Sequence, residues 1–215
     1  MTRRPLPDLS LYLVLDPALC GGHGGMVDTA CAAVRGGAQA VQLRLKEATT
    51  SDRIAAGQAL KAALAGSGAL LIVNDDLEAT LAIRAAGLHV GQGDLAAAEA
   101  RARLGPEPLL GVSVHSEATA RALDAALVDY AGAGPIFATP TKSDAETPTG
   151  WDGLARICAA APVPCIAIGG LKAHHAAPAL SAGAMGLSVV SAICGQPDPE
   201  SAARAFSRAI AEARP

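Results

Sequence analysis

The chain has 215 residues, of which 51% are hydrophobic and only 2% are aromatic. This length is sufficient for one substantial core in a single domain spanning residues 1–215, and the core must be built from Ala, Leu, Val and Ile. The formal net charge of −3 arises from 17 basic and 20 acidic residues. Because no long basic stretch accompanies it, this balance argues against a nucleic-acid-binding protein.

Cysteine usage and hydropathy point to a cytoplasmic protein. The five cysteines are odd in number and none has C-x-x-C spacing, so neither a disulfide framework nor a zinc site is indicated. No apolar segment with a cleavage site opens the chain, and we expect no signal peptide. The longest uncharged stretch, 176–197, is long enough to span a membrane. However, Pro178, Gly183 and Gly186 interrupt it, so we expect no membrane span.

Apolar runs alternate with helix-like segments along the chain. The predicted strands lie at 11–15, 40–43, 70–73, 88–90, 109–112, 129–134, 164–168 and 186–190. The predicted helices lie at 26–36, 51–64, 77–85, 94–104, 116–127, 151–160, 173–182 and 199–213, with Ser51 as the N-cap of the second. The glycine-rich segment 21–25 indicates a mobile loop or a close approach of backbone to ligand.

Eight strands that alternate with eight helices are typical of βα units. Short apolar strands with few charges suit a parallel sheet that is covered on both faces. Eight repeats in about 200 residues predict a compact (β/α)8 TIM barrel. A doubly wound open sheet is the alternative, which the absence of a G-x-G-x-x-G motif after the first strand weakens.

Two aspartates, Asp75 and Asp94, each follow the end of a predicted strand and can converge on one rim of the barrel. Paired carboxylates with oxygen-rich neighbours such as Asn74 are what a hard divalent cation needs. Each aspartate also has a simpler interpretation. Asp75, with Glu78 three residues on, resembles a helix N-cap, and Asp94 could cap the next helix.

Other polar residues also follow predicted strands. Three cations and two carboxylates around a metal suit a diphosphate. Backbone amides before the last two predicted helices indicate a second anion site at helix N-termini. Two phosphate sites imply two phosphorylated ligands, or one ligand with phosphate at both ends. The residues on the rim are Gln42, Arg44 and Lys46; Ser113; Thr139, Thr141 and Lys142; and Gly170, Val190 and Ser191.

Three of the five histidines have simple interpretations, and His115 is not expected to be a metal ligand. His115 is predicted to be a hydrogen-bonded rim residue, and His174 and His175 are predicted to lie on the surface at the start of a helix.

In the order of its motifs, the chain resembles thiamine phosphate synthases from about Tyr12 to Ile193. The T-P-T-K segment and the pairing of N-D with G-Q-x-D are the specific features, whereas the glycine pair is shared by many phosphate-binding barrels. The motifs are Q-L-R-L-K at 42–46, N-D at 74–75, H-V-G-Q-G-D at 89–94, G-V-S at 111–113, G-P-I-F-A-T-P-T-K at 134–142, A-I-G-G at 167–170 and V-V-S-A-I at 189–193.

The resemblance implies a (β/α)8 barrel that joins 4-amino-2-methyl-5-(diphosphooxymethyl)pyrimidine to 4-methyl-5-(2-phosphooxyethyl)thiazole with Mg²⁺. It implies that Asp75 and Asp94 bind the magnesium ion. The implied pyrimidine diphosphate contacts are Gln42, Leu43, Arg44, Leu45, Lys46, Asn74, Ser113 and Lys142, of which Arg44, Lys46, Ser113 and Lys142 are the expected catalytic residues. The implied thiazole phosphate contacts are Thr139, Pro140, Thr141, Gly170, Val190 and Ser191.

Two positions depart from the family pattern. Asp76 stands where the family often has a different residue, which adds negative charge near the expected metal. Leu45 stands where the family usually has Glu in Q-x-R-E-K, which leaves open how Arg44 and Lys46 are oriented.

Three other functions remain as alternatives. A thiazole tautomerase or regulatory branch of the same barrel shares a stretch like Ser113 to Ser116, although it tends to lack the T-P-T-K segment and the paired carboxylates. A non-catalytic sensor of phosphate ligands is the second, and a sugar-phosphate epimerase or isomerase is the third. The expected partners are two phosphorylated small molecules, with no nucleic acid and no membrane, and a homo-oligomer is possible.

Overall fold

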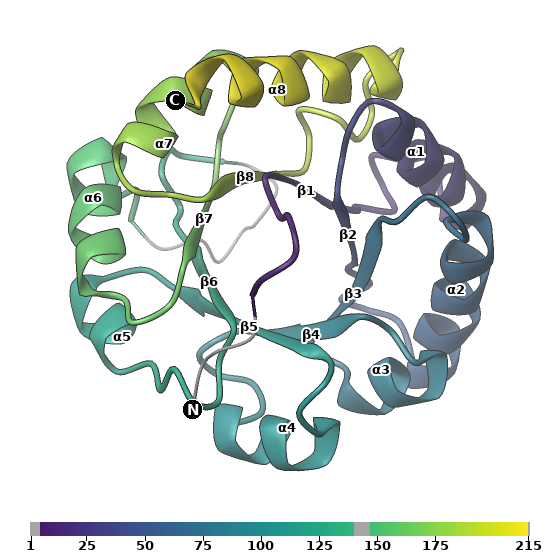
Figure 1. The fold of residues 1–215 in the computed structure, drawn as a ribbon. Coiled ribbons are helices and arrows are strands. Elements are labelled where there is room, and N and C mark those ends of the chain that lie inside the picture. The colour runs from purple at the N-terminus through teal and green to yellow at the C-terminus, as the bar shows by residue number, and fades with distance from the viewer. Residues whose placement is uncertain (1–4, 140–146, 215) are drawn as a thin grey trace.

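The computed structural model describes residues 5–139 and 147–214, and its strands form a closed barrel in the order β1 to β8 (Figure 1). All neighbouring strands are parallel, and β1 closes the ring against β8 through the pairing of Leu11 with Leu187. The predicted (β/α)8 barrel is therefore confirmed, and an open doubly wound sheet is excluded. The strands are β1 Leu11–Val14, β2 Ala40–Leu43, β3 Leu70–Asn74, β4 Gly87–Val90, β5 Leu109–Val114, β6 Tyr130–Ala133, β7 Cys165–Ile168 and β8 Gly186–Val189.

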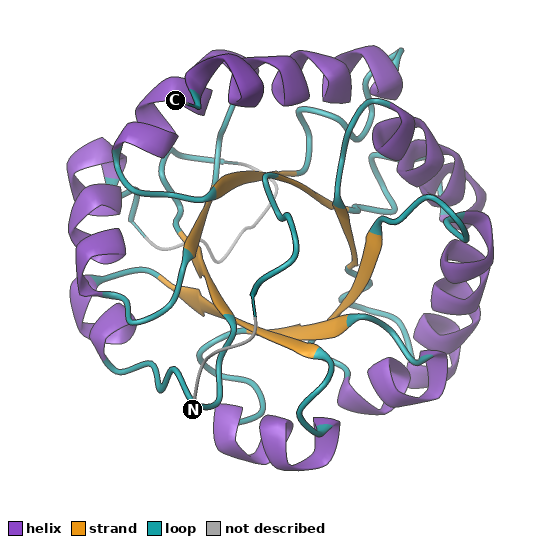
Figure 2. Ribbon diagram, viewed as in Figure 1, coloured by secondary structure: helices purple, strands orange, loops and turns teal. Residues whose placement is uncertain are grey.

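The helices surround the barrel as an outer ring (Figure 2). They are α1 His23–Arg35, α2 Thr50–Ala63, α3 Leu77–Ile83, α4 Ala97–Leu104, α5 Glu117–Arg121, α6 Gly150–Ala160, α7 Ala176–Ser181 and α8 Pro199–Ala213, and a short 3₁₀ helix, η1 Ala173–His175, precedes α7. The first and last helices pack so closely that there is no room for a side chain at Gly36. A Cβ atom there would lie only 2.4 Å from the carbonyl oxygen of Glu200.

Several helix boundaries differ from the prediction for local reasons. The helix α5 ends at Arg121 instead of continuing to 127, and Asp124 accepts a hydrogen bond from the backbone N–H of Ala126 at 2.8 Å. Asp side chains that bond to nearby backbone in this way compete with helical hydrogen bonding. The cap of α2 is Thr49 rather than Ser51, because Thr49 forms a reciprocal capping box with Asp52.

The glycine-rich segment 21–25 is only partly a loop, since α1 begins at His23. A Cβ atom at Gly25 would lie 1.7 Å from the carbonyl oxygen of Cys20. The close backbone approach that glycine permits here is therefore between Gly25 and the preceding turn of the chain itself.

Two apolar cores result from the alternation of side chains along the strands. The larger core fills the space between the strands and the helices. The smaller core lies inside the barrel and includes Tyr12, Ile72 and Tyr130. Leu9, which precedes β1, is 0% exposed and belongs to this inner core. The segment that carries it crosses the end of the barrel that faces the viewer in Figure 1.

Within residues 5–139 and 147–214, no helix combines the length and the hydropathy that a membrane crossing requires. The uncharged stretch 176–197 instead contains the short helix α7 and the strand β8.

Because Leu9 is buried just before β1, we predict that its side chain closes the inner core at the amino-terminal end of the strands. Leu9→Ala should lower the free energy of unfolding by about 3 kcal/mol, because it leaves a cavity in a packed core. For a chain of this size, that loss corresponds to a fall in Tm of about 10 °C. Thermal unfolding followed by circular dichroism measures it. The matched control is Leu81→Ala on α3, whose side chain is 38% exposed; equal losses in both variants would contradict the sealing role.

Candidate functional site

The carboxyl ends of the eight parallel strands meet at one rim, where βα loops build the active sites of such barrels. The structure brings most of the predicted site residues to this rim. Residues 140–146, with the predicted contacts Pro140, Thr141 and Lys142, lie outside the described residues. The described residues at the rim are Gln42, Arg44 and Lys46 from β2 and its loop, Asn74 and Asp75 from β3, Asp94 after β4, Ser113 from β5, Thr139 after β6, Gly170 after β7, and Val190 and Ser191 after β8.

The centre of the site is a contact between two carboxylates. The side chains of Asp75 and Asp94 come from different loops and interact directly with each other. Asn74 donates its amide N–H to Asp75, and the backbone N–H of Gly91 donates to Oδ2 of Asp94 at 2.7 Å. Asp75 has a left-handed backbone with φ of 61°, a conformation that non-glycine residues seldom adopt.

Loss of hydration around its carboxyl group, together with the neighbouring Asp94, raises the pKa of Asp75 to about 6. The positive charge of Arg44 and the hydrogen bond from Asn74 act on this pKa in the opposite direction, but they are weaker. Although its carboxyl group has lost hydration, Asp75 as a whole remains exposed to solvent. The pair therefore combines two like charges at a place where a proton or a cation would relieve their repulsion.

Neither aspartate caps a helix, so the capping interpretation is wrong for both. The N-cap of α3 is Asp76, whose Oδ1 accepts from the backbone N–H of Ala79 at 2.8 Å. The predicted capping partner Glu78 instead pairs with Arg103. The helix α4 begins at Ala97, beyond Asp94, and has no side-chain cap.

The donor set around this pair fits a magnesium ion. Over the described ranges 5–139 and 147–214, no group of three or more His, Cys, Asp or Glu is arranged to hold a metal. Mg²⁺ is commonly bound by one or two carboxylates, with substrate phosphates and waters completing its shell. Asp75 and Asp94 supply that number of carboxylates, and the like charges in contact supply the electrostatic demand for a cation.

The end of β2 and the loop that follows it carry two basic residues, Arg44 and Lys46, at the same rim; we call this segment the basic arm. Gln42 faces the barrel interior, and Arg44, two residues further on, continues on the same side by the alternation of the chain. Lys46 lies in the turn that follows β2 and is exposed. Leu43 and Leu45 are buried in the outer core between strands and helices. Their side chains face away from the site, so any substrate contact at these two positions must come from the backbone.

A residue that the sequence did not reveal, Arg53 on α2, holds this arm in place. Its Nε and Nη2 donate to the carbonyl oxygen of Leu45 at 3.0 and 2.8 Å, and Nη2 also donates to that of Lys46 at 3.0 Å. Its Nη1 pairs with Oδ2 of Asp76 at 3.2 Å. The orientation of Arg44 and Lys46 therefore does not need a side-chain carboxylate at position 45. No motif marks Arg53, because its partners are backbone carbonyls and a helix cap.

The second predicted anion site needs a correction. Gly170 has φ of 66°, and a Cβ atom there would lie 2.8 Å from Cβ of Phe137. The amides of Val190 and Ser191 do not begin α8. They enter a turn in which the N–H groups of Ile193 and Cys194 donate to the carbonyl oxygen of Val190 at 3.0 and 2.8 Å. The helix N-terminus argument is therefore wrong for β8, although these residues do lie at the rim.

An aromatic cluster joins the residues after β6 to α6 and η1. The ring of Phe137 is 5.1 Å from that of Trp151 and 4.9 Å from that of His175. His174 is exposed as predicted, whereas His175 is only partly exposed because its ring packs in this cluster. His115 is also half-buried and follows β5.

Comparison with known proteins identifies the family. The model of the family described as "Thiamine monophosphate synthase" matches residues 11–193. The chain belongs to the thiamine monophosphate synthase family. The thiamine-phosphate synthase of Moorella thermoacetica is 42% identical over 97% of this chain and 99% of its own length. That of Solidesulfovibrio magneticus is 48% identical over 97% of this chain and 98% of its own.

Solved structures agree with this membership. The thiamine phosphate pyrophosphorylase from Pyrococcus furiosus superposes with a TM-score of 0.85 and 30% identity, covering 96% of this chain and 97% of that chain. A 3-hexulose-6-phosphate synthase, 20% identical with a TM-score of 0.68, shares the fold alone. The resemblance inferred from the motifs is confirmed, and this member of the thiamine monophosphate synthase family is an enzyme of thiamine biosynthesis.

The repulsion within the acidic pair predicts a pH-dependent gain in stability when Asp75 is neutralised. Because the folded pKa of about 6 exceeds the ordinary aspartate value of 3.8, the folded state binds a proton more tightly than the unfolded state, and stability falls as pH rises through this interval. Asp75→Asn should thus raise the free energy of unfolding of the metal-free protein by about 1 kcal/mol at pH 8, after allowance for solvent screening, and by much less at pH 4. Asn tolerates the left-handed backbone of this position.

Thermal unfolding in the presence of a chelator, at both pH values, measures this difference. Asp28→Asn, at an exposed position on α1, is the control for losing a carboxylate. A gain of the same size at both pH values would contradict the proposed repulsion.

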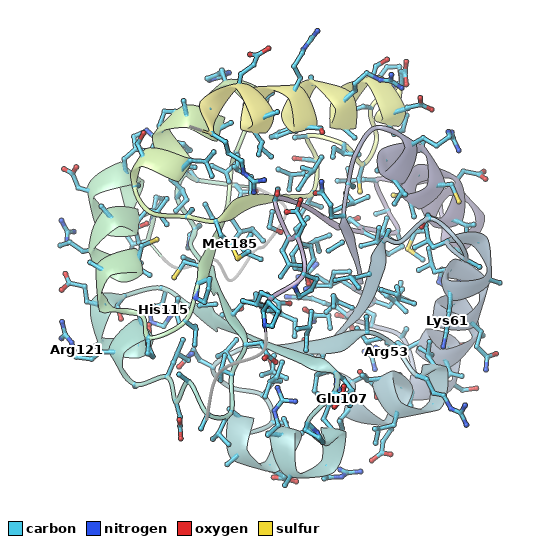
Figure 3. The ribbon with its side chains drawn as sticks, viewed as in Figure 1. Arg53, Lys61, Glu107, His115, Arg121 and Met185 are labelled. Carbon is cyan, nitrogen blue, oxygen red and sulfur yellow. The ribbon has the colours of Figure 1, made fainter. Side chains whose placement is uncertain are left out.

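Arg53 binds two backbone carbonyls and one carboxylate, so we predict that its removal lowers the free energy of unfolding. Arg53→Ala should cost about 2 kcal/mol, because two backbone carbonyls and the nearly buried carboxylate of Asp76 lose a charged donor. The matching fall in Tm is about 4–8 °C. The control is Arg121→Ala, whose side chain is 70% exposed and points outward (Figure 3). Similar Tm values for the two variants would show that Arg53 does not anchor the basic arm.

Proposed function

We propose that this enzyme condenses 4-amino-2-methyl-5-(diphosphooxymethyl)pyrimidine with 4-methyl-5-(2-phosphooxyethyl)thiazole, giving thiamine phosphate and diphosphate in a Mg²⁺-dependent reaction. The observation that carries the proposal is the contact between Asp75 and Asp94, with Arg44 close enough to lower the pKa of Asp75. Two carboxylates that demand a cation, next to a basic arm, match the charges of a metal-bound diphosphate.

In this reaction Asp75 and Asp94 would hold the magnesium ion. When bound, the ion neutralises charge on the diphosphate oxygens and makes diphosphate a better leaving group. Arg44 and Lys46, which follow β2 at the rim, bind the remaining diphosphate charge, together with Lys142. Asn74 donates its amide N–H to Asp75, so its carbonyl oxygen is the group that it offers to a ligand.

The bond changes require little acid–base chemistry. The lone pair of the thiazole nitrogen forms a bond to the methylene carbon of the pyrimidine, while the bond from this carbon to the diphosphate oxygen breaks and its electron pair leaves with diphosphate. The electron-rich aminopyrimidine stabilises positive charge on the methylene carbon, which favours a dissociative path. Arg44, Lys46 and Lys142 contribute by stabilising charge that develops on the leaving group.

The second substrate would bind across the rim from the acidic pair. Backbone N–H groups of Gly170, Val190 and Ser191, together with Thr139 to Thr141, are the proposed partners of the thiazole phosphate. Backbone amides at βα turns after the last strands are a common phosphate site in barrels of this kind.

The deciding experiment supplies both substrates and Mg²⁺ and measures thiamine phosphate and diphosphate. We expect the two products in equal amounts, and we expect a chelator to abolish their formation. Isomerisation of the thiazole with neither product would support the tautomerase alternative. Binding of ligands with no reaction at all would support the sensor alternative.

The metal assignment predicts a selective loss in Asp94→Ala. Turnover should fall by about 100-fold or more at limiting Mg²⁺, because only one of the two carboxylates remains. Affinity for the thiazole phosphate, measured by calorimetry, should stay within about twofold of wild type. Glu99→Ala, an exposed carboxylate on α4, is the control. Near-normal turnover of Asp94→Ala at limiting Mg²⁺ would refute the assignment.

A further inference from the structure

A continuous chain of five polar side chains, which we call the relay, crosses the barrel interior beneath the rim. Nε2 of Gln42 donates to the hydroxyl of Tyr12 at 2.8 Å, and the hydroxyls of Tyr12 and Tyr130 are 3.0 Å apart. The Tyr130 hydroxyl lies 3.2 Å from Nδ1 of His89, whose Nε2 lies 3.0 Å from Oγ of Ser113. The relay thus connects β2 to β5, two strands that are not neighbours in the sheet.

The relay is built into a closely packed interior. Tyr12 is 2% exposed, Tyr130 is 0% exposed and His89 is 9% exposed. A Cβ atom at Gly111 would lie 2.2 Å from Cζ of Tyr130 and 2.5 Å from Nδ1 of His89. A Cβ atom at Gly132 would lie 3.1 Å from Cε1 of His89. The glycines on β5 and β6 therefore make the space in which His89 and Tyr130 meet.

The protons of the relay can be assigned from its geometry. Burial raises the pKa of both tyrosines, so each hydroxyl keeps its single proton. Because Tyr12 already accepts from Gln42, its own proton points to Tyr130, and the proton of Tyr130 points to Nδ1 of His89. A neutral His89 that accepts at Nδ1 carries its proton on Nε2 and donates to Ser113.

The direction of these hydrogen bonds determines which polar group Gln42 and Ser113, the two ends of the relay, present to a ligand. Gln42 has its N–H engaged below, so it presents its carbonyl oxygen. Ser113 accepts from His89, so its own hydroxyl proton is available as a donor. If the amide of Gln42 were rotated, every hydrogen bond would reverse, and the two ends would present an N–H donor and an acceptor oxygen instead. A mixed state would leave a buried hydroxyl proton without an acceptor, which costs free energy.

We propose that the relay couples Gln42 to Ser113 and fixes their hydrogen-bonding polarity for the pyrimidine diphosphate, with Tyr12, Tyr130 and His89 as positioning residues. This inference rests on the proposed function, in which Gln42 and Ser113 contact that substrate. An exocyclic amine needs an acceptor such as the carbonyl of Gln42. A ring nitrogen or a phosphate oxygen needs a donor such as the hydroxyl of Ser113. The thiazole phosphate, bound at β7 and β8, does not depend on the relay.

The polarity can be tested without substrate. Nitrogen-15 NMR of the histidine rings in the ligand-free protein reports which ring nitrogen carries the proton, and His89→Gln assigns the signal among the five histidines. We expect the Nε2–H tautomer at His89. We expect Tyr130→Phe, which removes the donor to Nδ1, to shift His89 toward a mixture of tautomers. An Nδ1–H tautomer or a doubly protonated ring in the wild type at pH 8 would overturn the proposed polarity.

The role in positioning is tested by comparing the two substrates. Tyr12→Phe and Tyr130→Phe should each raise KM for the pyrimidine diphosphate by about tenfold, the effect of about one hydrogen bond, and leave KM for the thiazole phosphate and kcat within about twofold. The double variant should resemble either single variant, because each interrupts the same chain. Ser188→Ala, a buried hydroxyl on β8 outside the relay, is the control and should leave both KM values unchanged.

Equal changes in both KM values would overturn the positioning role and show a general structural defect. Calorimetry of the pyrimidine diphosphate with the same variants gives the same comparison without turnover. An inactive wild type would therefore count against the proposed function, whereas the tautomer and the binding affinities would still decide the relay. If Tyr130→Phe fails to fold, Tyr12→Phe provides the comparison.

Discussion

The structure depends on one geometric constraint, the closure of eight parallel strands into a ring. Closure brings the carboxyl end of every strand to the same rim, and the two-residue alternation of each strand decides which side chains face the interior. On β2 and its loop this alternation separates the inward Gln42 from the outward Leu43 and Leu45. A single segment can therefore stabilise the outer core and supply polar groups to the site, because the two tasks fall on opposite faces of the chain.

The acidic pair shows how such a rigid frame supports an unfavourable arrangement. Asp75 has a left-handed backbone and contacts another carboxylate, and both features cost stability. The flanking groups hold it nonetheless. Asn74 and Gly91 donate to the two carboxylates, and Asp76, the next residue, caps α3 and pairs with Arg53. Arg53 also binds the backbone of the basic arm. One guanidinium therefore holds both Asp76, next to the acidic pair, and the segment that carries Arg44 and Lys46.

The few aromatic residues are placed where shape or polarity matters. The chain has two tyrosines, and both lie in the barrel interior within the relay. Phe137, which follows β6, contacts Trp151 on α6. Aliphatic residues fill most of both cores. Aliphatic packing thus provides most of the stability, while the tyrosines combine a rigid apolar ring with a hydroxyl that can transmit a hydrogen bond through a buried space.

Sequence alone determined the alternation of strands and helices, the barrel, and the rim positions of Asp75, Asp94 and the basic arm, because polar residues directly follow apolar runs. Its motifs also identified the family. It did not show that Asp76 is the helix cap, that α5 ends early, or that Arg53 supports the site. The relay was equally hidden, since Tyr12 and His89 lie inside apolar runs and look like core residues. Tyr12 meets Tyr130 across 118 positions of the chain, and only closure of the barrel brings such distant groups together.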